Sequence, residues 1–189
     1  MTAGVAVNRR ARKYTRGQQF RRVLWSLAQP LFRFSPRPCF GWRRALLRAF
    51  GAQVGRGVHI YPSATIYMPW NLSIGDWSSI GEFAFVYNLG PVSVGAGSTI
   101  SQHAHLCAGT HDYSRADMPL LKPPIRIGDA VWICAGAFLG PHVTVGDGAI
   151  VGARAVVSKP VLPWTIVAGN PARFLKPRPM HEAASIGGN

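Results

Sequence analysis

Aliphatic side chains recur at every sixth position over most of residues 54–157. A period of six matches neither the 3.6-residue period of an α-helix nor the two-residue alternation of simple hairpins. A small side chain often follows four residues after the aliphatic one, as at Ala64, Ser78 and Ala84. One large and one small inward residue per flat segment, followed by a turn, predict a coil built from three hexapeptides. All 17 positions of the repeat are Ile, Leu or Val: Val54, Ile60, Ile66, Leu72, Ile74, Ile80, Val86, Val92, Val94, Ile100, Leu106, Ile127, Ile133, Leu139, Val145, Val151 and Val157.

The repeat is interrupted at three points. Its register shifts by two residues between Leu72 and Ile74 and between Val92 and Val94, and it stops between Leu106 and Ile127. Insertions into a solenoid form loops on one face, and that face often binds a ligand. The long insert, residues 107–124, carries the sequence GTHD and with it His111. A lone histidine in a surface loop is more often solvated than catalytic, so the insert by itself leaves both interpretations open.

The positive charge of the chain is concentrated at one end. Residues 1–50 contain 12 of the 21 Lys and Arg residues and none of the 7 Asp and Glu residues, which leaves residues 51–189 with a net charge of only +2. The basic arm leaves a nucleic-acid binder as an alternative, but the confinement of the charge to this arm counts against it. No nucleic-acid partner is therefore predicted, although a basic scaffold remains an alternative.

The chain divides into four predicted segments. Residues 1–19 are expected to form a disordered basic tail, residues 20–52 a basic and aromatic helical arm, residues 53–167 the repeat with its insert, and residues 168–189 a C-terminal tail. Within the arm, we expect two short helices broken by Pro30, Pro36 and Pro38. Such an arm can cap the end of a solenoid, or its Arg, Trp and Phe side chains can contact an anionic membrane. We expect a cap that also makes weak contact with a membrane surface.

Composition also bears on location and on metals. The sequence has no apolar run of 18 residues and no signal peptide, which predicts a cytoplasmic protein, peripheral at the inner face of the membrane if the arm binds lipid. Cys39, Cys107 and Cys134 are an odd number without CxxC spacing. This pattern favours neither a disulfide framework nor a zinc cluster, so no metal is expected.

Several phrases of the sequence are more specific than the repeat. YMPWNLSIGDWSSIG, VYNLG and ISQHAHLCAGTHDYS resemble the colanic-acid-type exopolysaccharide O-acetyltransferases of the hexapeptide-repeat acyltransferase family, as does FGA before the repeat. PIRIGDAVWICAGAFLGPHVTVGDGAIVGARAVV and AGNPARFLK resemble the galactoside/maltose acetyltransferase group. The resemblance covers residues 20–178 and implies a mainly β fold, a left-handed parallel β-helix. The left hand rests on the resemblance, because the general rule for parallel crossovers is right-handed.

The resemblance further implies acetyl-CoA as co-substrate and a homotrimer with active sites between subunits. His111 matches the general base, which takes the proton of a sugar hydroxyl as that hydroxyl attacks the thioester. Asp112 either orients the imidazole or caps the turn, and Asn88 either contacts the acceptor or serves a turn. The positions that match the acyl-CoA side are Trp132, Ala135 through its backbone N–H, Ala153, Ser158, Lys159 and Arg173, with Lys176 as a further candidate.

The predicted function is an O-acetyltransferase that acts on a sugar hydroxyl in exopolysaccharide or surface-glycan synthesis. Cys134 and His142 stand where the galactoside/maltose group commonly has glycine, so short acyl groups other than acetyl stay open. The alternatives are an amino-acid or antibiotic acceptor, a non-catalytic scaffold at a membrane surface, and a carbonic anhydrase. The last requires three histidines, here His103, His105 and His111, around zinc at a subunit boundary.

Overall fold

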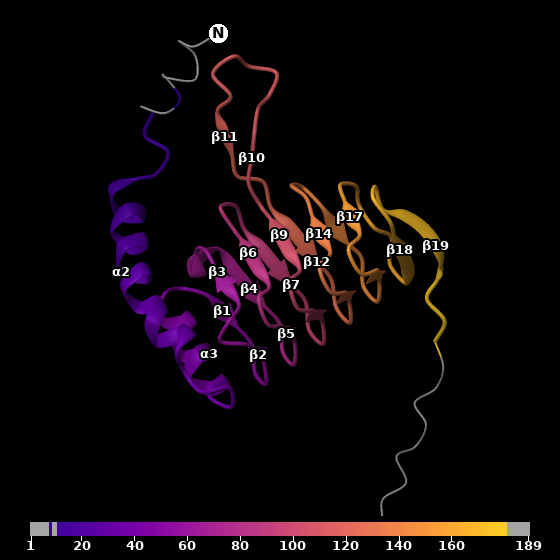
Figure 1. Cartoon of the computed structure of the whole chain (residues 1–189), viewed down its shortest axis with the longest axis horizontal. Coiled ribbons are helices and arrows are strands. Elements are labelled where there is room, and N and C mark those ends of the chain that lie inside the picture. Colours follow the sequence, from indigo (N-terminus) through magenta and orange to yellow (C-terminus); the bar gives the residue numbers. More distant parts are fainter. Residues whose placement is uncertain (1–7, 9–10, 181–189) are drawn as a thin grey trace, which may run out of the picture.

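The strands wind into a parallel β-helix with three flat faces, and two helices lie across its N-terminal end (Figure 1). The computed structural model describes residue 8 and residues 11–180. The first face contains β1 (Gln53–Val54), β4 (Leu72–Ile74), β7 (Val92–Val94), β12 (Ile125–Ile127) and β15 (Thr144–Val145). The second face contains β2 (His59–Ile60), β5 (Ser79–Ile80), β8 (Thr99–Ile100), β13 (Trp132–Ile133), β16 (Ile150–Val151), β18 (Thr165–Ala168) and β19 (Arg173–Pro177). The third face contains β3 (Thr65–Ile66), β6 (Phe85–Tyr87), β9 (His105–Cys107), β14 (Phe138–Leu139) and β17 (Val156–Val157).

The interior follows the six-residue repeat. Every one of the 17 aliphatic positions is buried, with an exposed fraction of 8% at Val54 and less at all the others. The small residues four positions later are buried as well, including Ser78, Ala84 and Ala104. The large and the small inward residues therefore together fill the interior of the prism. The predicted parallel β-helix is confirmed.

On the flat faces, the polarity of the coils leaves one kind of backbone group free at each end, whereas corner bonds such as Trp77 N to Arg56 O at 2.8 Å run the other way. Along the helix, the N–H groups of one coil donate to carbonyls of the next, as His59 N does to Ser78 O at 2.9 Å and Gly55 N to Ile74 O at 2.8 Å. The first coil consequently ends in carbonyls that no earlier coil can satisfy. Unpaired carbonyls at a sheet edge invite pairing with other chains or cost free energy when they are buried.

The helices α2 (Arg16–Arg33) and α3 (Phe40–Ala49) cover this first coil. Their donors reach its free carbonyls, and a guanidinium suits the task because it has five N–H donors and no acceptor. The bonds are Trp25 Nε1 to Ile66 O at 2.9 Å, Arg43 Nε to Ile60 O at 2.6 Å, Arg44 Nη1 to Val58 O at 2.9 Å and Arg48 Nε to Val54 O at 2.9 Å. Three of the arginines of the arm therefore serve as hydrogen-bond donors for the cap.

The arm differs from the expectation in two respects. Helix α2 begins at Arg16, inside the segment 1–19 that was expected to be disordered, and Thr15 with Gln18 forms a capping box there. Pro30 lies inside α2 and does not end it. A proline removes one backbone hydrogen bond of a helix, but Trp25 and Phe32 on either side of it are buried against the first coil. The break falls instead between the two helices, where Pro36 and Pro38 lie.

The C-terminal end is closed by a strand. β19 runs antiparallel to β18, so the expected tail 168–189 begins with ordered structure. The remainder of both predicted tails, residues 1–7, 9–10 and 181–189, lies outside the described residues. None of the helices in the described part of the chain combines the length and the apolar character needed to cross a bilayer.

Candidate active site

The insert folds into a hairpin that projects from the coils between the third and the first face (Figure 1). Its two strands, β10 (Thr110–His111) and β11 (Leu120–Leu121), pair antiparallel, with His111 opposite Leu120. A further hydrogen bond joins Asp112 N to Pro119 O at 3.0 Å. The hairpin thus carries His111 on ordered backbone, with its side chain exposed.

One contact fixes the imidazole of His111. Its Nδ1 lies 2.7 Å from the carbonyl oxygen of Met118. A carbonyl can only accept, so Nδ1 carries the hydrogen and, in the neutral ring, Nε2 keeps its lone pair. Nε2 is then available as a proton acceptor, which is the tautomer that a general base requires. Sequence reasoning missed Met118, because it acts through its backbone and its side chain gives no signal.

Asp112 is not the residue that orients the ring. Its Oδ1 accepts hydrogen bonds from the backbone N of Ser114 at 3.1 Å and from the Ser114 hydroxyl at 2.5 Å. These bonds form an Asx turn at the tip of the hairpin. Of the two interpretations that the sequence left open, the structure supports the turn.

Asn88 likewise has a structural part. Its side chain is fully buried. Its Oδ1 accepts from Met68 N at 2.8 Å and its Nδ2 donates to Met68 O at 2.6 Å. Asn71 in turn donates to the carbonyls of Asn88 and Leu89 at 3.1 and 2.8 Å. These hydrogen bonds join the two places where the repeat shifts register. Within this chain, the Asn88 side chain is therefore not free to contact an acceptor sugar.

Three of the candidate cofactor residues lie together along the second face and the corner after it. The indole of Trp132 is about half exposed, and its Nε1 donates to the Ser101 hydroxyl at 2.9 Å. Ala135 and Ala153 occupy the same corner on successive coils, joined by the bond from Arg154 N to Ala135 O at 2.9 Å. Within residues 11–180, no oxygen accepts a hydrogen bond from the Ala135 N–H. That donor is therefore without a partner in the described part of the chain.

The other three candidates meet in a separate groove. Ser158, Lys159 and Arg173 line a groove of about 450 Å³ at the C-terminal end of the coils, together with Leu162 and Phe174. The two cations suit phosphates, and the exposed apolar side chains suit a base or an alkyl chain. The structure therefore brings the six predicted cofactor residues together as two sets of three.

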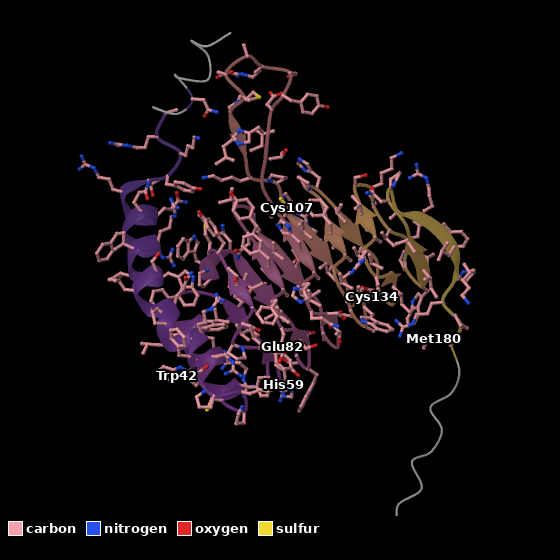
Figure 2. All side chains as sticks on the ribbon, in the orientation of Figure 1. Trp42, His59, Glu82, Cys107, Cys134 and Met180 are labelled. Atoms are coloured by element: carbon pink, nitrogen blue, oxygen red, sulfur yellow. The ribbon has the colours of Figure 1, made fainter. Side chains whose placement is uncertain are left out.

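The candidate base and the Trp132 set lie on different sides of one chain. The hairpin leaves the coils after the third face, whereas Trp132 lies on the second face. In Figure 2, Cys107 marks the root of the hairpin and Cys134, next to Ala135, lies away from it toward the opposite edge of the coils. A single chain does not unite these groups in one pocket.

His103 and His105, the other two histidines near the insert, have packing partners. His103 lies at a corner and stacks on Phe83, with ring centroids 5.1 Å apart. His105 on β9 packs edge-on against Phe138 at 5.2 Å, and burial lowers the pKa of its imidazole. Its Nε2 is buried and has no partner among the described residues. The described residues contain no group of three His, Cys, Asp or Glu side chains arranged to hold a metal.

Comparisons with known proteins agree with this architecture. The family model "Bacterial transferase hexapeptide (six repeats)" matches residues 124–159. The putative colanic acid biosynthesis acetyltransferase WcaF of Escherichia coli (strain K12) is 40% identical over 154 residues, which cover 82% of this chain and 85% of WcaF. Galactoside O-acetyltransferase of the same strain is 28% identical over 142 residues, covering 71% of this chain and 68% of that enzyme.

A solved structure shares the whole fold. The hexapeptide-repeat-containing acetyltransferase VCA0836 from Vibrio cholerae superposes with a TM-score of 0.81 at 25% identity, covering 88% of this chain and 95% of that one. The same Vibrio protein has also been solved with acetyl coenzyme A. A parallel β-helix interrupted by one histidine-bearing hairpin defines the class of protein, an acyltransferase of hexapeptide type. The extent of the WcaF match then shows that the chain belongs to the hexapeptide-repeat acetyltransferase family. The predicted enzyme class and the predicted co-substrate, acetyl-CoA, agree with these findings.

Proposed function

We propose that this protein transfers the acetyl group of acetyl-CoA to a sugar hydroxyl in the synthesis of an exopolysaccharide or related surface glycan. The observation that carries the proposal is the hydrogen bond from His111 Nδ1 to the Met118 carbonyl, which leaves Nε2 as the free base of an exposed imidazole. The name of its relative WcaF supports the sugar acceptor.

The reaction proceeds by direct transfer. His111 Nε2 takes the proton of the acceptor hydroxyl while its oxygen attacks the thioester carbonyl carbon. The carbonyl oxygen gains negative charge, and the free Ala135 N–H is the donor that stabilises it. When the C–S bond breaks, the leaving thiolate takes the proton from the imidazolium. The products are the acetylated sugar and CoA, and the histidine is neutral again.

No cysteine is needed as nucleophile. Burial raises the pKa of the Cys134 thiol, which disfavours the reactive thiolate. The Cys107 thiol lies 3.4 Å from the Gly109 carbonyl and has no neighbouring base that would activate it in the described structure. A ternary complex without an acyl-enzyme is consistent with both.

Acetyl-CoA would extend along the coils from Trp132 toward the C-terminal groove. The half-exposed indole and the small side chains of Ala135 and Ala153 leave room for the pantetheine arm close to the corner. Lys159 and Arg173 supply positive charge for the phosphates of the nucleotide end. We propose a homotrimer, in which the hairpin of one subunit brings His111 to the cofactor wall of its neighbour.

Thiol release from acetyl-CoA with a panel of sugar acceptors tests the proposed function. We expect His111→Ala to lower kcat by about 10²–10⁴-fold, the usual contribution of a general base. Asp112→Ala is the matched control, because it removes the turn bonds next to the same histidine and leaves the Met118 contact in place. Equal rates for wild type and a folded His111→Ala protein would eliminate the proposed base.

The shared site is tested by complementation. Ala135→Pro removes the backbone N–H, and the fold accepts a proline there because Pro62 occupies the same corner of the first coil. We expect about a 10²–10³-fold loss of kcat. Gln102→Pro, at the same corner of the preceding coil, is the control. Mixed trimers of Ala135→Pro and His111→Ala subunits should regain activity, since one of their interfaces combines two intact halves. A fully active monomer would contradict the shared site.

The outer face of α2 supports the additional proposal of weak contact with an anionic membrane. It exposes an apolar stripe at helical spacing, Phe20, Val23, Leu24, Leu27, Leu31 and Phe34. The surrounding residues 1–50 hold 12 Lys and Arg and no acidic residue. An apolar stripe flanked by cations suits the surface of anionic lipid. Vesicles with phosphatidylserine should co-sediment wild type at low salt and not Leu27→Ser/Leu31→Ser, and absence of wild-type binding would refute the contact.

A further inference from the structure

Two cations share one aromatic ring beside the hairpin. Lys122, which directly follows β11, places its Nζ 4.2 Å from the centroid of the Tyr14 ring and donates to the Lys13 carbonyl at 2.8 Å. The guanidinium of Arg22, from α2, lies 4.3 Å from the centroid of the same ring. The residues before α2 thus meet the root of the hairpin, and we name Tyr14, Arg22, Tyr67, Tyr87 and Lys122 the Tyr14 cluster.

The other aromatic members of the Tyr14 cluster are Tyr67 and Tyr87. Arg22 Nη2 donates to the Tyr67 hydroxyl at 3.1 Å, and the rings of Tyr67 and Tyr87 are 5.0 Å apart. Burial raises the pKa of Tyr14 and of Tyr87, and neighbouring phenols add to the effect at Tyr87. The raised pKa keeps Tyr14 and Tyr87 in the neutral form, so these two phenols do not balance the charge of Arg22 and Lys122. They offer instead aromatic faces and hydroxyl groups, which sugars and phosphates bind well.

The cations have no acidic partner in the described part of the chain. Six of the seven acidic residues lie there, and each one is engaged elsewhere: Asp76 with Arg56, Glu82 with Arg37, Asp117 with Arg115, Asp112 with Ser114, Asp129 with the Ala96 N–H and Asp147 with the Asp129 N–H. Burial, and then the charge of Arg22, lower the pKa of Lys122. Two like charges held close together in a partly buried site are unfavourable until an anion binds beside them.

The Tyr14 cluster lies on the same side of the hairpin as the candidate base. His111 is opposite Leu120, and cross-strand partners point to the same face of a two-stranded sheet. Lys122 is two residues beyond Leu120, so alternation returns its side chain to that face, as a diagonal neighbour of His111. Diagonal neighbours across an antiparallel pair are about 7–8 Å apart. This separation is comparable to that between a sugar hydroxyl and a phosphate on the same sugar.

We propose that Arg22 and Lys122, with the ring of Tyr14, bind a phosphate group of the acceptor and thereby select a glycosyl phosphate over a neutral sugar. Nucleotide-linked and lipid-linked sugars both supply this chemistry. The inference rests on the proposed function, since the phosphate is positioned so that a nearby hydroxyl reaches His111. It adds a residue from α2 and a residue from the hairpin to the acceptor site, which explains why the arm extends beyond the first coil.

Kinetics with paired acceptors test the selection. We expect Arg22→Gln and Lys122→Gln each to raise the KM for UDP-glucose or glucose 1-phosphate by roughly 10- to 100-fold, the loss of one charge-assisted hydrogen bond. The KM for methyl glucoside and for acetyl-CoA should stay unchanged, and Lys122→Arg should recover most of the loss. Arg33→Gln, an exposed arginine farther along α2, is the control. An equal loss with charged and neutral acceptors, or a raised KM for acetyl-CoA, would overturn the proposal.

Binding separates this inference from the proposed function. Calorimetric titration of the full chain with inorganic pyrophosphate needs no turnover, so it remains informative if no acceptor is acetylated. In the Lys159→Gln/Arg173→Gln background, which removes the other proposed phosphate contacts, we expect binding that weakens with added salt, that is unchanged by His111→Ala and that is lost in the double variant Arg22→Gln/Lys122→Gln. Binding that persists in the double variant would overturn the assignment. Among active acceptors, a nucleotide sugar and a short-chain lipid diphosphate sugar then distinguish the two carriers.

Discussion

The two ends of this β-helix face opposite problems and are closed by different chemistry. Because each coil donates the N–H groups of its flat faces to the following coil, these faces present carbonyls at the N-terminal end and N–H groups at the C-terminal end. The first need is met by side chains that only donate, the arginines of α3 and the indole of Trp25. The second is met by a strand, since β19 brings backbone carbonyls to β18.

The two ends also differ in how far their side chains are buried. The N-terminal cap is dense, with Arg43, Leu47 and Trp25 all buried. The C-terminal strand β19 is exposed along its length and leaves a groove beside Lys159. We therefore expect substitutions at the N-terminal end to change stability, and substitutions at the C-terminal end to change the binding of acetyl-CoA.

The largest expected effect is at Arg43. Its guanidinium donates to the carbonyls of Ile60, Pro36 and Arg37 and to the Ser35 hydroxyl while it is fully buried. Arg43→Met would leave these carbonyls unsatisfied and should lower the free energy of unfolding by about 3 kcal/mol. Urea unfolding measures this, with Arg33→Met as the exposed control. A smaller loss of unfolding free energy than in Arg33→Met would mean that water satisfies these carbonyls as well as Arg43 does.

A smaller loss is expected at Trp25. Trp25→Phe removes the bond to the Ile66 carbonyl and part of the buried ring, and should cost about 2 kcal/mol. Trp42→Phe is a matched control, because that indole also donates to a carbonyl, of Leu31, but is about half exposed. Thermal unfolding of the two variants should differ clearly. Equal shifts would show that the carbonyl edge of the first coil does not depend on α2.

The smallest expected effect lies at the opposite end. Lys159→Gln and Arg173→Gln should each raise the KM for acetyl-CoA about tenfold, because each removes one charged contact with phosphate. Both side chains are exposed, so the free energy of unfolding should change by less than about 0.5 kcal/mol. Initial rates and urea unfolding on the same preparations test the pair of statements. A stability loss without a change in KM would contradict the expectation that the C-terminal end binds acetyl-CoA and contributes little to stability.

Much of the fold was contained in the sequence. The six-residue repeat predicted the parallel coils because the inward positions of a solenoid must be apolar in every turn, and all 17 of them are buried. The interruption after Leu106 predicted a projecting loop, and its GTHD phrase pointed to His111. Family resemblance added the cofactor residues, which the structure brings together as two sets of three.

The sequence did not predict the partners that act through the backbone or across distant segments. Met118 orients His111 through a carbonyl, and every residue type has one, so no sequence signal marks it. Asp112 and Asn88 resembled site residues, but their hydrogen bonds go to Ser114 and Met68. Pro30 predicted a helix break that burial on both sides overrides.

The sequence alone therefore determined the periodic core and the position of the hairpin insert, since hydrophobic spacing and its interruption are local properties of the chain. Only the tertiary structure decided how the basic arm is used. In the sequence these arginines look like free charges. In the structure Arg43 is buried among carbonyls, and Arg22 contacts the same ring, Tyr14, as Lys122, a hundred positions away. Charge is a property of a residue, but whether it is satisfied depends on neighbours that only folding brings together.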